Sequence, residues 1–259
     1  MQENLVSIIT PCYNGSRYIG ETINSVLAQT YKEWEMIIVD DGSKDNSAEI
    51  IEEFAKKDSR IKLIRQPNGG SANARNNGIR NAEGRYIALL DADDLWDSEF
   101  LEEQLKFMHE KNVVLVYGSY RRIDENSNEI LKPLIAREKS TLKDMQRMCY
   151  IGCLTGLYDS KKFGKVYLKE ELKSVRDDYA YWLDIMNFEK VAYGNQKVLA
   201  SYRVMVNSVT GKKAKLIKAQ YNFYRNYLKL GFFRSVYNTL YWGLSGIFKF
   251  FGVLRKVVK

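Results

Sequence analysis

Short apolar runs alternate with segments of helical periodicity over the first 120 residues. Five of these runs have the length and the β-branched, apolar composition of buried strands. The segments between them repeat apolar residues at the spacing of amphipathic helices. Together they predict an α/β fold with a mainly parallel, doubly wound sheet flanked by helices on both faces. The predicted strands are 5–10, 36–39, 61–64, 86–90 and 113–117, and the predicted helices include 19–27, 50–54, 72–81 and 101–108.

The pattern is less regular after residue 120. A helical stripe of apolar and aromatic residues begins at Tyr179, directly after the acidic pair Asp177 and Asp178. The other elements that the sequence predicts here are a strand at 130–135, a short helix at 142–149 and two late strands at 191–193 and 198–202.

Acidic residues follow two of the predicted strands. Asp91, Asp93 and Asp94 come directly after the run 86–90, and Asp40-Asp41 ends the run 36–39. Carboxylates packed so closely repel one another unless a cation is present, and hard oxygen ligands suit Mg²⁺ or Mn²⁺. Because the carboxyl ends of parallel strands meet at one edge, both groups are expected in one crevice. Each group also has a simpler interpretation, as a solvated turn or helix cap.

A glycine-containing loop precedes the helix predicted at 72–81. Backbone amides of Asn68, Gly69 and Gly70, together with the positive charge of Arg75, suit phosphate oxygens near a helix start. The sequence has neither a P-loop signature nor the G-x-G-x-x-G pattern of dinucleotide-binding folds, which argues against both classes.

The composition fits one large domain, or one domain with an appendage, because 45% of the 259 residues are hydrophobic. The chain begins almost at once with a strand-like run, so no secretory signal is predicted. Cys12, Cys149 and Cys153 are accompanied by a single histidine, His109. This set favours free cytosolic thiols over disulfides or a zinc site.

Charge divides the chain into two unlike parts. The first 189 residues have a net charge of −6, whereas the last 70 have 14 Lys and Arg, no Asp or Glu, and a net charge of +14. The segment 214–230 has the pattern of an amphipathic helix, and 232–254 is rich in aromatic residues. The most apolar stretch, 240–254, contains Lys249 and is shorter than the ~20 apolar residues of a membrane-spanning helix.

The tail therefore favours a helix that lies on an anionic membrane surface. A re-entrant or spanning segment and a soluble helical pair packed on the main domain remain alternatives. A basic, aromatic tail is also compatible with nucleic-acid binding, although the net acidic first part and the absence of a recognised nucleic-acid motif argue against that function.

The order of these motifs is more specific than any one of them. It resembles the nucleotide-sugar domain of family 2 glycosyltransferases, which have the GT-A fold. The resemblance covers about residues 4–120, extends through 177–182 and fades after Arg203. The segments that resemble the family are Val6-Ser7-Ile8-Ile9-Thr10-Pro11-Cys12-Tyr13-Asn14, Ile38-Val39-Asp40-Asp41-Gly42-Ser43, Asn68-Gly69-Gly70, Ala74-Arg75-Asn76-Asn77-Gly78, Asp91-Ala92-Asp93-Asp94 and Asp177-Asp178-Tyr179-Ala180-Tyr181-Trp182.

The resemblance implies a role for each matching residue. Asp178 would be the catalytic base and Asp177, where the family often has Glu, its supporting acid. Asp93 or Asp94 would bind the metal, and Tyr181 and Trp182 would contact the acceptor, unless Trp182 lies in the core. The residues implied in donor binding are Pro11, Tyr13, Asn14, Asp40, Asp41, Gly70, Arg75, Asp91 and Ala92.

The resemblance also implies an activity. We expect an inverting, Mn²⁺- or Mg²⁺-dependent transfer of a hexose or N-acetylhexosamine from a UDP-sugar to a saccharide hydroxyl, in surface polysaccharide synthesis. The acceptor would be linked to a polyprenyl diphosphate, with the protein on the inner face of the plasma membrane and no nucleic-acid partner. Residues 1–120 would bind the donor, 121–210 the acceptor and base, and 211–259 the membrane. A catalytically inactive homologue that only binds a sugar nucleotide is the remaining alternative.

Overall fold

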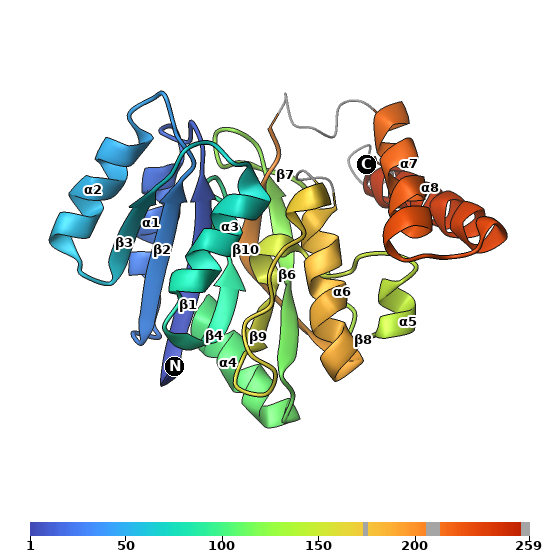
Figure 1. The fold of residues 1–259 in the computed structure, drawn as a ribbon, viewed down its shortest axis with the longest axis horizontal. Coiled ribbons are helices and arrows are strands. Elements are labelled where there is room, and N and C mark those ends of the chain that lie inside the picture. Colours follow the sequence, from blue (N-terminus) through green and yellow to red (C-terminus); the bar gives the residue numbers. More distant parts are fainter. Residues whose placement is uncertain (173–175, 206–212, 255–259) are drawn as a thin grey trace.

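A computed structural model describes residues 1–172, 176–205 and 213–254, with side chains from 216 to 246 in the last range. One twisted sheet forms its centre, with helices on both faces (Figure 1). The parallel part of the sheet has the strand order β3-β2-β1-β4. These strands are β1 (Gln2–Cys12), β2 (Trp34–Asp40), β3 (Ile61–Arg65) and β4 (Gly84–Leu89).

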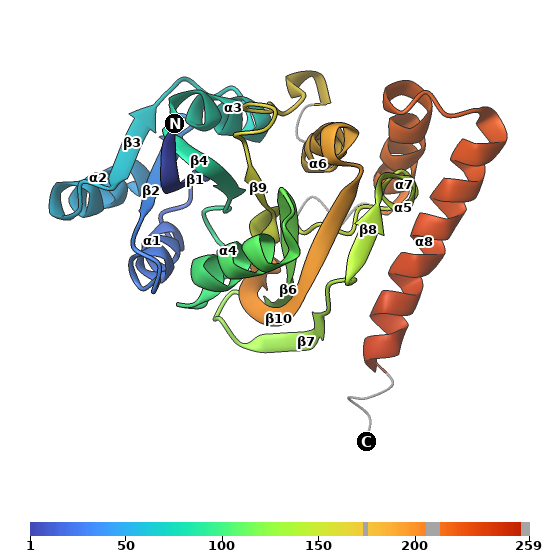
Figure 2. The same ribbon diagram turned by 90° about the horizontal axis from the view of Figure 1, so that it is seen from below.

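Successive residues of the parallel strands face two different cores. Ile8 and Ile38 pack in one hydrophobic cluster and Ile9 and Ile37 in the other, and all four are fully buried. This burial on both faces explains why the strands are continuous apolar runs. The helices of the two faces, α3 and α6 on one side and α1 and α4 on the other, appear above and below the sheet in Figure 2. Their bounds are α1 (Ile19–Leu27), α3 (Ser71–Asn81), α4 (Phe100–Lys111) and α6 (Asp177–Glu189), while α2 (Ser47–Lys57) packs on α1 and β3.

Beyond β4 the sheet is mixed. Strand β9 (Leu157–Asp159) lies antiparallel between β4 and β6 (Leu115–Ile123). The long strand β10 (Val191–Arg203) runs parallel to β6. The two late strands predicted from the sequence are therefore one strand, because the polar residues between them form an irregularity in the β6 pairing rather than a turn. The remaining strands are β5 (Leu95–Trp96), β7 (Glu129–Leu134) and β8 (Lys139–Thr141).

Short helical turns connect the strands of the mixed part. The helix predicted at 142–149 is shorter: α5 (Leu142–Met145) begins at a capping box formed by Thr141 and Asp144. Single 3₁₀ turns occur at η1 (Cys153–Thr155) and η2 (Glu170–Leu172).

The C-terminal helices pack against α5 and α6 (Figures 1 and 2). The predicted amphipathic helix is α7 (Lys213–Asn222), which continues as a π-helical turn, η4 (Phe223–Tyr227), and a second helix, α8 (Phe232–Leu254), follows. The Phe223 ring stacks 4.7 Å from that of Tyr179 on α6. Within the described ranges, no helix has the length and hydropathy needed to span a membrane. The boundary predicted at residue 211 lies outside these ranges.

Candidate active site

A hollow of about 660 Å³ opens at the carboxyl ends of β1, β2 and β4. We call it the strand-end hollow. Its walls come from loops that directly follow these strands and from the start of α3, as expected for a ligand site in a sheet of this kind. The sequence-predicted residues that line it are Pro11, Tyr13, Asn14, Asp41, Gly70, Arg75, Asp91, Ala92 and Asp93.

The carboxylate of Asp41 holds the glycine loop in place. Its Oδ1 accepts hydrogen bonds from the amide of Gly69 and the side chain of Gln66, both at 2.8 Å, and its Oδ2 accepts one from the amide of Gly70 at 2.8 Å. A carboxylate has about four acceptor positions, so roughly one remains for a ligand N–H or hydroxyl. Gly70, at φ 87, adopts a conformation that favours glycine.

Arg75 links the hollow to the start of α6. Its buried guanidinium donates to Asp91 Oδ1 at 2.5 Å and to Asp177 Oδ2 at 3.4 Å. Buried ion pairs need such geometry, because each unpaired charge would be costly to desolvate. Arg75 thus joins Asp91, an acid of the hollow, to Asp177 of the predicted acidic pair, which lies 86 residues after Asp91 in the sequence.

Asp178 is the neighbour of that fixed acid. Its side chain is partly exposed, and its Oδ1 accepts a hydrogen bond from the Tyr179 amide at 2.8 Å. Burial raises the pKa of Asp178, as does the charge of Asp177, whereas Arg75 opposes the rise. A carboxyl group with a raised pKa is a better proton acceptor than an ordinary aspartate.

The three acids after β4 have different environments. Asp91 is paired with Arg75, and Asp94 is buried outside the lining of the hollow, with Oδ1 accepting the Arg203 amide at 2.9 Å. Asp93 lines the hollow and forms no ion pair among the described residues. Burial, followed by the charge of Asp91, raises the pKa of Asp93 to about 6.

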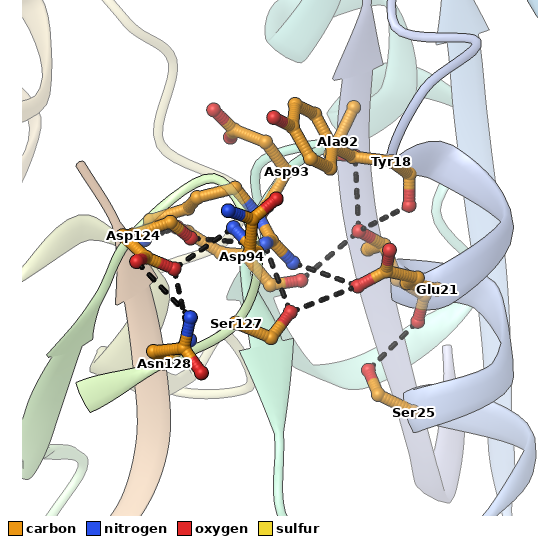
Figure 3. A network of polar contacts seen from close by, with 12 residues as sticks. Tyr18, Glu21, Ser25, Ala92, Asp93, Asp94, Asp124, Ser127 and Asn128 are labelled. Carbon is orange, nitrogen blue, oxygen red and sulfur yellow. Dashed lines mark hydrogen bonds and ion pairs between the residues drawn. The ribbon is translucent and has the colours of Figure 1, made fainter. Parts of the chain in front are cut away.

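These acids fit a divalent cation that is completed by a ligand. Among the described residues, no group of three or more His, Cys, Asp or Glu side chains is arranged to hold a metal alone. Mg²⁺ and Mn²⁺ sites often use one or two carboxylates, with substrate phosphates as further ligands. The Asp93 carboxylate, which points away from the network around Asp94 in Figure 3, has the required chemistry and position.

Arg203, at the end of β10, supports this acidic loop from behind. Its buried side chain donates to the carbonyl oxygens of Asp93 at 2.8 Å and Asp124 at 3.2 Å, and to Glu21 Oε2 at 2.8 Å. The guanidinium also lies 4.4 Å from the ring centroid of Tyr18. Figure 3 labels the partners in this network, among them Tyr18, Glu21 and Asp124. The loop is therefore fixed by a residue more than 100 positions away in the sequence.

Comparison with known proteins identifies the family. The family model described as Glycosyl transferase family 2 matches residues 7–166. The chain belongs to glycosyl transferase family 2. Its relatives include a putative teichuronic acid biosynthesis glycosyltransferase, TuaG of Bacillus subtilis (strain 168), with 37% identity over 90% of this chain and 92% of the relative. WfgD of Escherichia coli, named a UDP-Glc:alpha-D-GlcNAc-diphosphoundecaprenol beta-1,3-glucosyltransferase, is 37% identical over 86% of each chain.

Solved structures confirm the expected GT-A type of fold. Staphylococcus aureus TarS, residues 1–349 in complex with UDP, matches with a TM-score of 0.66 and 22% identity over 88% of this chain and 75% of that chain. A mannosyltransferase from Pyrobaculum calidifontis, PcManGT in complex with GDP-Man and Mn²⁺, matches with a TM-score of 0.64 and 18% identity over 87% and 64%. At these identities the likeness concerns the fold.

Not every predicted site residue of this glycosyltransferase reaches the hollow. Tyr181 and Trp182 are fully buried in the core, and the Trp182 ring packs so closely on Gly156 that a side chain at Gly156 would collide with it. Neither aromatic face is open to a sugar, so Trp182 has the core position that the sequence left as an alternative. Asp40 is buried at the end of β2, with Oδ1 3.4 Å from the Ser43 amide.

The hollow also contains residues that the sequence did not indicate. Arg17 and Tyr18 belong to the turn before α1, where nothing in the pattern marks them as functional, and Met205 follows β10. Only the position of Cys12, Gly15 and Ser71 beside predicted residues was a usable signal. Asn68, which also lines the hollow, belongs to the glycine loop that the sequence indicated, and the lining residues outside the predicted set are Cys12, Gly15, Arg17, Tyr18, Ser71 and Met205.

Proposed function

We propose that this glycosyltransferase moves a hexose or N-acetylhexosamine from a UDP-sugar to a hydroxyl of a polyprenyl-diphosphate-linked saccharide, with inversion at the anomeric carbon. The observation that supports it most is the bridge from Asp91 through Arg75 to Asp177, beside Asp178. The bridge joins a hollow suited to a nucleoside diphosphate to a carboxylate suited to deprotonating an alcohol. The printed name of WfgD specifies a UDP-sugar and a diphosphate-linked acceptor.

In this proposal the donor occupies the strand-end hollow. The free acceptor position of Asp41 takes the N–H of the uracil ring, and Pro11, Tyr13 and Asn14 form the wall beside it. Asp93 would hold a Mn²⁺ or Mg²⁺ ion, which would neutralise the charge that develops on the leaving diphosphate. Arg75 orients Asp91 toward the donor.

Asp178 then acts as the general base. It accepts the proton of the acceptor hydroxyl while the hydroxyl oxygen bonds to the anomeric carbon, on the face opposite the diphosphate. The bond from the anomeric carbon to the diphosphate oxygen breaks, and the nucleoside diphosphate departs. Asp177, held by Arg75, keeps the start of α6 in position. Its charge raises the pKa of Asp178, and Arg75 opposes that rise.

The division of the chain follows from these roles. Residues 1–120 bind the donor, 121–210 complete the site with the base and the acceptor region, and 211–259 associate with the membrane. On α8, Phe233, Tyr237, Leu240 and Leu244 recur at helical spacing and are 86, 56, 61 and 54% exposed. An apolar face of this kind, on a tail rich in Lys and Arg, suits the anionic inner face of the plasma membrane.

A donor panel tests the activity. The protein is incubated with UDP-glucose, UDP-galactose and UDP-N-acetylhexosamines, with Mn²⁺ or Mg²⁺, with and without polyprenyl-diphosphate-linked saccharides, and UDP release is measured. We expect acceptor-dependent release from at least one donor. UDP binding without turnover on any acceptor would instead identify a homologue that only binds sugar nucleotides.

A further inference from the structure

A second hollow, of about 280 Å³, lies between α5 and α8. We call it the α5–α8 hollow. It is lined by Lys143, Arg147, Arg234, Tyr237 and Asn238. Three of these five side chains are cationic and none is acidic. Cations that converge in this way repel one another, so the arrangement favours an anionic ligand. Arginine in particular matches the oxygen geometry of phosphate groups.

Contacts within the protein hold three of these residues in place, Asn238, Arg234 and Arg147. Asn238 Nδ2 donates to the Gln146 carbonyl at 3.2 Å, and Arg234 Nη2 lies 3.2 Å from Gln146 Oε1. The Arg147 guanidinium lies over two rings of α8, 5.9 Å from the centroid of Tyr237 and 5.3 Å from that of Tyr241. The hollow therefore has a fixed form rather than being a chance meeting of surface lysines.

The one carboxylate of α5 does not balance the three cations of the hollow, although its charge acts on Arg147. Asp144 is the acid of α5, but its carboxylate accepts hydrogen bonds from the Thr141 hydroxyl and amide and lies 3.7 Å from Arg137. Among the described residues, neither Lys143 nor Arg234 forms an ion pair. Their charges are available to a ligand.

The position of α8 relates this hollow to the catalytic pair. Trp242, one turn after Asn238, lies under the guanidinium of Arg176, 4.9 Å from the ring centroid. Arg176 directly precedes Asp177 and Asp178. At 1.5 Å per residue, Arg234 and Trp242 are ~12 Å apart along the helix. On the same helix, the apolar side chains of Phe233 and Leu240 are exposed.

We propose that the α5–α8 hollow binds the diphosphate of a polyprenyl-diphosphate-linked acceptor, with the prenyl chain along the exposed face of α8 and the saccharide directed toward Asp178. This inference rests on the proposed function. The contact between α8 and Arg176, next to the base, favours the acceptor over an ordinary membrane phospholipid, whose headgroup has no reason to lie beside the catalytic pair.

Steady-state kinetics in neutral detergent, without phospholipid, test the proposal. The first variant, Lys143→Gln/Arg234→Gln, changes two exposed side chains of the hollow, and the second variant is Arg147→Gln. The control, Lys106→Gln, changes an exposed lysine on α4. Two acceptors with the same saccharide are compared, one on a polyprenyl diphosphate and one as a phosphate-free alkyl glycoside. We expect the KM for the diphosphate acceptor to rise about tenfold or more, because charge-assisted hydrogen bonds are lost. The kcat, the donor KM and the KM for the glycoside should stay unchanged.

The same KM for wild type and both variants would overturn the proposal, as would an equal rise for both acceptors. An effect confined to anionic vesicles would assign the hollow to phospholipid headgroups and also overturn it. Binding of a soluble prenyl diphosphate, measured with saturating UDP and without metal, gives a readout independent of transfer. Weaker binding of the prenyl diphosphate by the double variant would support the proposal. Absence of transfer to either acceptor by the wild-type protein would contradict the proposed function and leave this binding result unaffected.

Discussion

Arg75 and Asp177 lie 3.4 Å apart, Nη1 to Oδ2, although 102 residues separate them in the sequence. The other guanidinium nitrogen of Arg75 holds Asp91. One buried cation therefore fixes an acid of the strand-end hollow and the acid next to Asp178, so that the two halves of the site are set relative to each other.

Replacing the base should remove transfer and leave donor binding. We expect Asp178→Asn to lower kcat by roughly 10²- to 10⁴-fold, because an amide cannot accept the hydroxyl proton. The affinity for UDP should stay within about twofold of wild type, by calorimetry. Asp184→Asn is a matched control on the same helix, since Asp184 instead contacts Tyr227 and Lys169. Near-normal turnover by Asp178→Asn would contradict the assignment of the base.

The pH dependence should change when Arg75 is neutralised. A general base works in its deprotonated form, so kcat should fall as the pH drops through the pKa of Asp178, which burial and Asp177 raise above that of an ordinary aspartate. Arg75 lowers this pKa, so Arg75→Gln should move the acid limb of the kcat profile to higher pH. Arg80→Gln, an exposed change in the last turn of the same helix, should leave the limb in place. An unshifted limb in Arg75→Gln would show that this cation does not act on the base.

The neighbouring acids Asp93 and Asp94 should respond differently to amide substitution. Asp93→Asn should lose the increase in UDP affinity that Mn²⁺ provides, because Asp93 faces the hollow. Asp94→Asn should keep it, since an asparagine oxygen can still accept the Arg203 amide. Calorimetric titrations of UDP, with Mn²⁺ or with EDTA, compare the two variants. Loss of the metal effect in Asp94→Asn alone would reverse the assignment.

The parallel half of the fold could be predicted from the sequence because its strands are buried on both faces. Continuous apolar runs such as that ending at Leu89 are visible without tertiary information, and polar residues after them mark the site. The mixed half was less predictable: β9 has only three residues, and its place between β4 and β6 depends on long-range pairing. The one continuous strand β10 was predicted as two because polar residues interrupt its apolar pattern, where the pairing with β6 is irregular.

The residues that position the site were harder to find than those that line it. Arg203 looks like an ordinary basic residue at the end of a strand, and its function depends on Glu21 and Asp93, which are distant in the sequence. Trp182 follows the proposed catalytic pair, Asp177 and Asp178, in a helical stripe that both a core and a binding helix would show, and only packing against Gly156 distinguishes them.

Arg203 should contribute strongly to stability. Arg203→Gln leaves Glu21 and the carbonyl oxygens of Asp93 and Asp124 without their buried donor. The Glu21 side chain is 51% exposed and can be solvated, so the main cost is that of carbonyl oxygens left without a donor. A buried group left unsatisfied costs about 1–3 kcal/mol, whereas an exposed pair contributes about 1 kcal/mol or less. Arg65→Gln, which breaks an exposed pair with Glu52, is the control. Urea unfolding measures both free energies, and equal losses for the two variants would contradict the structural role of Arg203.

The exposed face of α8 should determine membrane binding. Phe233 and Leu240 are 86 and 61% exposed, so Phe233→Gln/Leu240→Gln should leave the melting temperature unchanged while removing apolar contacts with lipid. Burial of one such side chain contributes about 1.5–3 kcal/mol, so binding to anionic liposomes should weaken about tenfold or more. Ile135→Gln changes a 58% exposed side chain directly after β7, outside α8, and should have no effect. If sedimentation shows the same liposome affinity for both variants and wild type, α8 is not the membrane-binding element.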